Sequence, residues 1–109
     1  MATKNRTLGK ALTTSFANIY VVPARHKSLI KSVLISNTTA ALAKVSLDWY
    51  DSATTTYYTI CKDVAMFGNG IIQLEDSLWL QPDDLIRGLA NVAGVTISIY
   101  VEEQYAVAL

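Results

Sequence analysis

The sequence has little of what enzymes and metal proteins use to do chemistry. Its 109 residues include one cysteine and one histidine, so no internal disulfide can form. A single histidine becomes a general base only when the fold places an acid and a nucleophile beside it. No glycine-rich loop runs into a Gly-Lys-Ser or Gly-Lys-Thr segment, as phosphate binding would need. We therefore expect no enzyme activity, no metal, no cofactor and no small-molecule substrate.

Net charge and long apolar runs are also absent. The formal net charge is zero, which leaves no overall field to attract nucleic acid or an anionic membrane. No apolar run approaches the roughly 18 residues needed to cross a bilayer. The polar first residues lack the apolar core of a signal peptide. We expect no nucleic-acid partner, no membrane partner and synthesis in a cytoplasm.

What the sequence has in excess is apolar side chains. Hydrophobic residues make up 51% of it, and the mean hydropathy is +0.28. A chain of this length is expected to form one domain, residues 1–109, that buries roughly two thirds of its unfolded surface. Some apolar side chains should therefore face other protein chains. This surplus favours a homo-oligomer or another protein partner.

Two segments alternate as half-buried strands do. In residues 41–50, Ala43, Val45, Leu47 and Trp49 point to one side, and residues 95–103 repeat the pattern. Shorter strands are expected over residues 8–14, 17–22, 29–36, 56–61, 71–74, 78–80 and 85–90. Turn residues separate the strands, and no segment has helical periodicity. The spacing predicts an all-β fold: a single antiparallel β-sandwich or jelly-roll of about eight short strands.

The two ends of the chain differ from this pattern. Residues 1–12 begin with a polar stretch and are expected to form an N-terminal arm that orders against a neighbour or frays. Residues 104–109 form a mostly apolar C-terminal tail. Residues 62–67 stay unassigned. Gly88 interrupts a strand, which is typical of a bulge or of a close approach by another element.

Three segments between residues 17 and 103 carry a resemblance. Tyr20-Val21-Val22-Pro23 ends an early strand, and a second strand ends in an asparagine turn at Asn37. Residues 78–87 read Leu-Trp-Leu-Gln-Pro-Asp-Asp-Leu-Ile-Arg. In these segments the chain resembles small phage virion proteins of the capsid-decoration, or cement, type. Asp83 stands where that family commonly has glycine, so a type I turn is expected there.

The resemblance implies a structural role in a virion. Such a protein would bind the major capsid protein at the capsid surface and stabilise the shell as a homo-oligomer, with trimers at symmetry axes. The alternative is a tail or collar accessory protein that binds a host glycan or receptor. A small enzyme is the third and least favoured interpretation.

The candidate interface residues follow from charge and aromatic content. The basic residues near the start of the chain either form a solvated face or contact an acidic capsid surface. Exposed aromatic side chains would anchor an interface, although Trp79 fits a core position equally well. The candidates are Lys4, Arg6, Lys10, Arg25, His26, Lys27, Tyr57, Tyr58, Trp79 and Leu109.

The residues that could do chemistry have simpler explanations. His26 lies between two basic residues and is expected to be a solvated loop histidine. Cys61 is expected to be a small buried hydrophobe within a strand. Glu102 and Glu103 are neighbours in a strand, so they face opposite sides and cannot share a metal ion.

Overall fold

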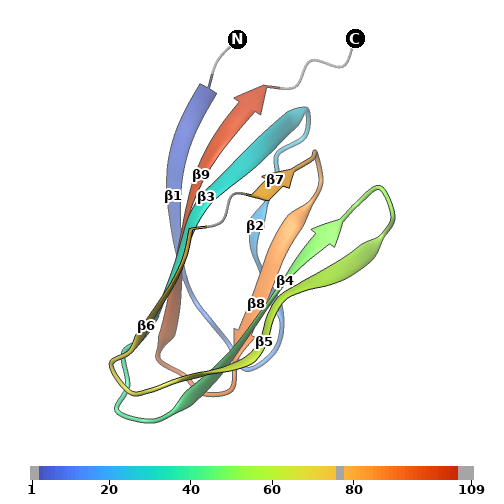
Figure 1. The fold of residues 1–109 in the computed structure, drawn as a ribbon. Helices are drawn as coiled ribbons and strands as arrows, with labels where there is room; N and C mark the ends of the chain where they lie inside the picture. Colours follow the sequence, from blue (N-terminus) through green and yellow to red (C-terminus); the bar gives the residue numbers. More distant parts are fainter. Residues whose placement is uncertain (1–2, 76–77, 106–109) are drawn as a thin grey trace.

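The computed structural model describes residues 3–75 and 78–105. These residues form nine antiparallel strands and no helix (Figure 1). The strands are β1 (Thr3–Ala11), β2 (Ala17–Val21), β3 (His26–Asn37), β4 (Ala43–Asp51), β5 (Thr56–Met66), β6 (Ile71–Leu74), β7 (Leu78–Leu80), β8 (Leu85–Ala90) and β9 (Val95–Tyr105). One sheet has the order β1-β9-β3-β6, with β7 also paired to β3, and the other has the order β2-β8-β4-β5. The two sheets form a sandwich, which confirms the predicted fold class.

The strand pairs are nested. β4 pairs with β5, β3 with β6 and β7, β2 with β8, and β1 with β9. The chain is therefore a long antiparallel ribbon that folds back on itself at the β4–β5 connection. This ribbon is rolled into two sheets, so that β9 also pairs with β3 and β8 also pairs with β4. β1 begins and β9 ends at the same end of the sandwich (Figure 1). The β3–β4, β5–β6 and β8–β9 connections meet at the opposite end, where Asn69 and Thr38 bond across them.

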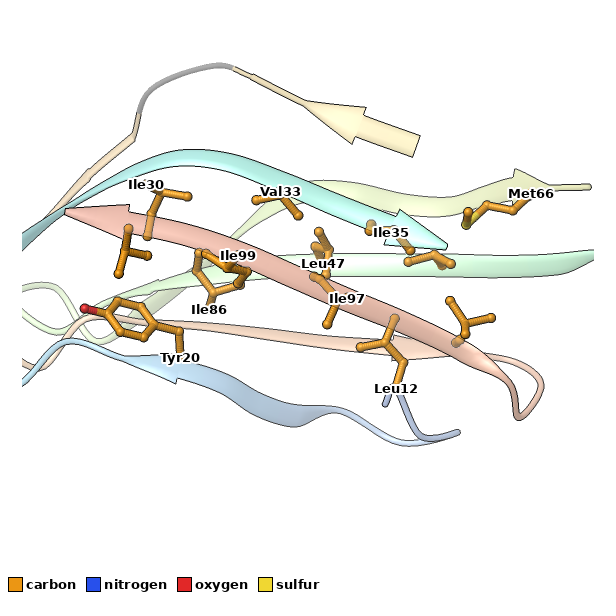
Figure 2. Close-up of a cluster of buried hydrophobic side chains, with 14 of the residues drawn as sticks. Leu12, Tyr20, Ile30, Val33, Ile35, Leu47, Met66, Ile86, Ile97 and Ile99 are labelled. Atoms are coloured by element: carbon orange, nitrogen blue, oxygen red, sulfur yellow. The ribbon is translucent and has the colours of Figure 1, made fainter. Parts of the chain in front are cut away.

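The core lies between the sheets and comes from the alternating segments. Val95, Ile97, Ile99 and Val101 of β9 are fully buried, as their spacing predicted. Facing them from β4 are buried Ala43, Val45 and Leu47, whereas Trp49 is only partly buried. Figure 2 shows side chains of both sheets pointing toward one another. Period-two alternation thus identified the two strands that supply much of the core.

Several strands are longer than the sequence predicted. β3 has 12 residues, and β5 and β9 have 11 each. Residues 62–66, unassigned from sequence, continue β5. His26 begins β3 and pairs with Tyr105, so it does not lie in a loop. Backbone pairing with a neighbouring strand extends a strand through polar residues, and such pairing leaves no periodic signal.

The expected N-terminal arm is an edge strand over the residues that the structure describes. β1 pairs with β9 from Thr3↔Gln104 to Ala11↔Thr96 without a register shift. The strand expected from residue 8 therefore starts at residue 3. Of the expected C-terminal tail, residues 104 and 105 belong to β9, and residues 106–109 lie outside the described residues.

Gly88 lies on β8, between β2 and β4 of the same sheet. A Cβ there would be 2.6 Å from Leu47 Cδ2 and 2.9 Å from Ile19 Cδ1. The close approach expected from its place in a strand is confirmed. β8 can pack between these two side chains because residue 88 has none.

The side chain of Asn37 closes the loop end of the sandwich. It is 1% exposed, and its Nδ2 donates to the carbonyl oxygens of Ala41 at 2.8 Å and of Met66 and Phe67 at 3.2 Å each. Its Oδ1 accepts from the backbone and hydroxyl of Thr39. We call this group the Asn37 latch, because one amide holds the β3–β4 loop against the end of β5.

A carboxylate closes the opposite end. Asp84 is 2% exposed; its Oδ1 accepts from the Ser52 backbone and hydroxyl, and its Oδ2 accepts from the Gln81 backbone. This Asp84 latch ties the β4–β5 loop to the turn before β8. Asp83 has a φ of 70°, and the Asp84 N–H donates to Gln81 O. The turn is therefore type II, and the type I expectation was wrong, since Asp83 takes the left-handed conformation that a type II turn requires at its third residue.

Candidate interaction surfaces

The groups that could form a nucleophile and base do not meet. The Ser28 side chain is fully buried, and its Oγ lies 2.6 Å from the Tyr20 hydroxyl. His26 instead places Nδ1 2.9 Å from the Ala24 carbonyl oxygen and its ring edge-on to Tyr105. Each group is engaged in a separate structural contact.

A buried polar cluster holds β1, β2 and β9 together near the chain ends. Glu103 is 4% exposed, and its Oε2 accepts from the Tyr20 hydroxyl at 2.5 Å and from Arg6 Nη1 at 3.2 Å. Burial, together with the hydrogen bond to Glu103, raises the pKa of Tyr20 well above its ordinary value. Glu102 points the other way, to Lys31 at 3.1 Å. The two carboxylates therefore lie on opposite faces, as their spacing predicted.

Cys61 is half-buried on β5. Burial raises the pKa of its thiol, which keeps the sulfur protonated and unreactive at neutral pH. Within residues 3–75 and 78–105, no three His, Cys, Asp or Glu side chains are close enough to hold a metal ion. The same residues contain no helix able to cross a membrane.

The most exposed large apolar side chains gather at the loop end. Phe67 is 79% exposed, Ile71 67% and Leu42 50%. Leu42 precedes β4, and the other two flank the Gly68-Asn69-Gly70 turn between β5 and β6. We call these three residues the apolar tip. Sequence reasoning recognised the turn and missed the tip, although a phenylalanine directly before a tight turn was a usable signal.

Backbone contacts hold the apolar tip in place. The Phe67 carbonyl oxygen accepts from Gly70 N at 2.9 Å, and Asn69 N donates to Thr39 O at 2.9 Å. A Cβ on Gly68 would lie 2.5 Å from the Ala40 carbonyl oxygen, so the two loops touch. No residue from 64 to 74 or from 38 to 43 is charged. The tip is an apolar projection on a hydrogen-bonded turn, and exposed large apolar side chains are suited to anchor an interface.

A second surface covers the outer face of the β2-β8-β4-β5 sheet. Arg87 lies between two aromatic rings, 4.1 Å from the centroid of Phe16 and 3.5 Å from that of Tyr57. Its Nη2 and Nε lie 2.9 and 3.0 Å from Asp48 Oδ2. We call this group the arginine stack. Asp48 thus pairs with the charge of Arg87, and the two aromatic rings cover the guanidinium.

The predicted aromatic pair is divided between two faces. Tyr57 tilts against Tyr50 on the outer side, with ring centroids 4.7 Å apart. Tyr58 stacks on Trp49 on the opposite side, with centroids 5.1 Å apart. Both tyrosines are 44% exposed, but they cannot form one platform.

Trp79 faces outward from the other sheet. It is 45% exposed, whereas Leu80 beside it is fully buried. Lys27 Nζ lies 5.3 Å from the Trp79 ring centroid. This resolves the alternative that the sequence left open, since the tryptophan is at the surface and a leucine is in the core.

The basic candidates do not form one surface. Arg6 binds buried Glu103, and Lys10 Nζ donates to the Asn18 carbonyl oxygen at 2.7 Å. Lys4 is exposed on the same strand, while exposed Arg25 lies in the β2–β3 loop with a φ of 63°. Leu109 lies outside the described residues. Two of the predicted contact residues thus hold this chain together.

A cleft opens between the sheets along the edge formed by β5, β6 and β7. Its volume is about 260 Å³. Trp49 and Ile60 line it from one sheet, and Leu74 and Leu78 from the other. The remaining lining residues are Ile30, Val33, Thr59 and Ile86. We call it the edge cleft; among the residues that the structure describes, none that lines it is charged, so it suits an apolar side chain.

Comparison with known proteins identifies the fold and no family. No protein-family model matches the chain, and no curated protein matches it. Among solved structures, it is similar to a chain of the Bacillus endospore appendages, which are described as disulfide-linked pili. That likeness has a TM-score of 0.60 and 13% identity, and covers 98% of this chain and 88% of the other.

Two further likenesses come from different settings. A chain of the capsid of Helicobacter pylori bacteriophage KHP30 gives a TM-score of 0.56 at 11% identity, covering 94% of this chain and 87% of the other. The Drosophila NLP-core, described with pentamer formation and histone binding, gives 0.53 at 12% identity, covering 95% and 100%. At such identities the likenesses establish a shared sandwich fold, and function has to be argued from the surfaces.

Proposed function

We propose that the chain is a structural protein of a phage virion, a capsid decoration or cement protein that binds the shell as a homo-oligomer. The observation that carries the proposal is the fold likeness to the phage KHP30 capsid chain over nearly the full length of both chains. It agrees with the independent resemblance of the strand-and-turn segments. On this proposal the protein is part of the virion and lies on the capsid surface.

The strand order supports a jelly-roll. When β6 and β7 are counted as one interrupted strand, eight strands pair as first with last and so on inward to β4 with β5. Such a rolled ribbon of two four-stranded sheets is the jelly-roll of many viral capsid proteins.

The surface supports a role in assembly. The apolar tip, the arginine stack and Trp79 expose large side chains on three separate parts of the molecule. A protein in a lattice needs several interfaces, both to its own copies and to the shell. We propose the major capsid protein as the second partner and a trimer as the oligomer, as the resemblance implies.

Stabilisation of the shell would follow from mass action. A subunit that binds only the assembled shell lowers its free energy by RT ln(1 + [L]/Kd) at each site. This amounts to about 2.7 kcal/mol at a concentration one hundred times Kd. Repeated over many sites, the effect becomes large without any chemical step.

The pilus likeness suggests a second candidate, a filament subunit, which the cysteine content disfavours. The sequence has one cysteine, and it is half-buried. One cysteine can join two copies by a disulfide but cannot continue a chain of such links. A disulfide-linked filament therefore does not fit this sequence.

The glycan-binding alternative lacks a common surface. Tyr57 and Tyr58 face opposite sides of one sheet, and Trp79 belongs to the other sheet. A sugar-binding platform needs aromatic rings that share a face. A tail or collar position remains compatible with the fold.

The direct test uses particles of the virus that encodes the chain. Density-gradient particles should contain the protein in a fixed ratio to the major capsid protein. Stripping the protein from the shell should lower the melting temperature of the shell, and adding it back should restore that temperature. Particles that lack the protein, or that melt identically with and without it, would overturn the proposal. A variant with Thr54→Ser on an exposed loop serves as the add-back control.

A further inference from the structure

We propose that the apolar tip of one copy inserts into the edge cleft of a second copy, and that this contact builds the homo-oligomer. The inference goes beyond the proposed virion role, because self-association would stand even if no shell bound the protein. It rests on the position, size and chemistry of the two features.

Position places both features on the same edge of the sandwich. The cleft has β5 on one rim and β6 and β7 on the other, through Ile60, Leu74 and Leu78. Phe67 lies in the connection that joins β5 to β6, and Ile71 is the first residue of β6. A contact between tip and cleft can therefore close, either reciprocally between two copies or around a ring of three, so that no cleft stays empty.

The volume of the edge cleft also matches the side chains of the apolar tip. An apolar protein cavity of about 150 Å³ accommodates a benzene molecule, which has the dimensions of a phenylalanine ring. The edge cleft, at about 260 Å³, holds the Phe67 ring and leaves room for part of Ile71. Phe67 is 79% exposed, so most of its ring is available to a partner.

The lack of charge on both surfaces favours a second copy of this chain over a charged partner. The two loops that form the tip carry no charge, and neither do the lining residues of the cleft within the part of the chain that the structure describes. These residues would therefore bury no unpaired charge in the contact. An unpaired buried charge strongly destabilises an interface. The formal net charge of zero leaves no long-range repulsion between copies.

The edge is suited to a side-chain contact and not to strand addition. β6 and β7 have only four and three residues, and the β4–β5 pairing shifts register between Val45 and Leu47 and again before Asp48. Short and bulged edge strands resist pairing with another chain. An inserted ring needs no regular edge.

The first test compares two matched surface variants in the purified protein. Phe67→Ser should raise the dissociation constant of self-association at least tenfold in sedimentation equilibrium. Val21→Ser, which removes a side chain that is 48% exposed on β2, should change it less than twofold. Because both side chains are exposed, both variants should fold. Equal effects of the two variants, or a wild type that stays monomeric at millimolar concentration, would overturn the inference.

The second test determines whether the tip of one copy lies next to the cleft of another. An Ile71→Cys protein, which keeps the Phe67 ring, and a Leu74→Cys protein, both carrying Cys61→Ser, are mixed and oxidised. Mixed disulfides between the two should form far faster than with Val21→Cys in place of Ile71→Cys. Equal rates would exclude insertion of the tip into the cleft. Neither test involves a shell, so failure here leaves the virion role standing, and failure to bind particles leaves this contact standing.

Discussion

Both ends of the sandwich are held together by buried polar side chains, but one end exposes an uncharged apolar surface and the other a charged one. At the loop end, the neutral amide of Asn37 holds the strands together beneath the uncharged apolar tip. At the opposite end, where β1 begins and β9 ends, the carboxylates of Asp84 and Glu103 hold the strands together. They lie beside the charged loop that contains Arg25. The difference separates residues that hold the fold from residues available to partners. Buried polar groups carry the first task, and exposed apolar groups are suited to the second.

The comparison also explains the motif residues of the resemblance. Asn37 and Asp84 both belong to the segments that carry the sequence resemblance, and both are buried latches. Those segments therefore report on how the sandwich is closed. They say little about which surface binds a partner.

The largest expected effect is at the Asn37 latch. Asn37→Ala removes the donor to three carbonyl oxygens and the acceptor for Thr39, at a side chain that is 1% exposed. Lost networks of this kind destabilise strongly, and we expect the free energy of unfolding to fall by about 3 to 4 kcal/mol. Urea unfolding monitored by tryptophan fluorescence measures it. A loss below about 1 kcal/mol would mean that the loops close without the latch.

The Asp84 latch should come second. Asp84→Ala leaves the donors at Ser52 and Gln81 unpaired, and we expect a loss of about 2 to 3 kcal/mol. Asp84→Asn keeps one acceptor oxygen, so about half of the loss is expected. The same urea titration tests both variants, and equal losses for the two would show that the charge and second oxygen of the carboxylate contribute little.

A smaller effect on the free energy of unfolding should appear only at alkaline pH, and it comes from the Tyr20 hydroxyl that binds Glu103. The pKa of Tyr20 is raised from 10.0, so above pH 10 the unfolded chain loses this proton while the folded chain keeps it. The free energy of unfolding should therefore fall by up to about 1.4 kcal/mol for each pH unit above 10. Tyr20→Phe removes this contribution. Urea titrations from pH 8 to 11 test it, and identical pH slopes for variant and wild type would contradict it.

The smallest expected effect on stability is at the apolar tip. Phe67→Ser changes a side chain that makes little contact with the core, so the free energy of unfolding should change by less than about 0.5 kcal/mol. Trp79→Ala should behave similarly on the opposite sheet. Calorimetry at low protein concentration measures both in the unassociated state. A loss comparable to that of Asn37→Ala would erase the distinction between the two classes of residue.

The sequence predicted the parts of the fold that side-chain burial determines. Alternation identified β4 and β9, and turn chemistry placed the breaks at Asn37 and Pro82. It could not predict that β1 starts at residue 3, because the backbone bonds to β9 are independent of side-chain type. Nor could it predict that Asp83 adopts a positive φ, since the buried Asp84 fixes that turn through contacts distant in sequence.

The interface residues were harder to predict for a physical reason. A basic side chain looks the same in sequence whether it faces a partner or, like Arg6, a buried carboxylate of its own chain. The sequence likewise could not decide between an inward and an outward Trp79, because its neighbours are apolar on both sides. The exposure of Phe67 was within reach, since apolar residues in tight turns have no strand partner to cover them.

Hydroxyl-radical footprinting of the dilute and the assembled protein tests the central claim most directly. The account predicts that Phe67, Ile71 and Leu42 lose most of their labelling on assembly. Tyr105 at the opposite end, 37% exposed, should keep its labelling. Protection of Tyr105 with unchanged labelling of Phe67 would contradict the account, because assembly would then cover the charged end and leave the apolar tip exposed.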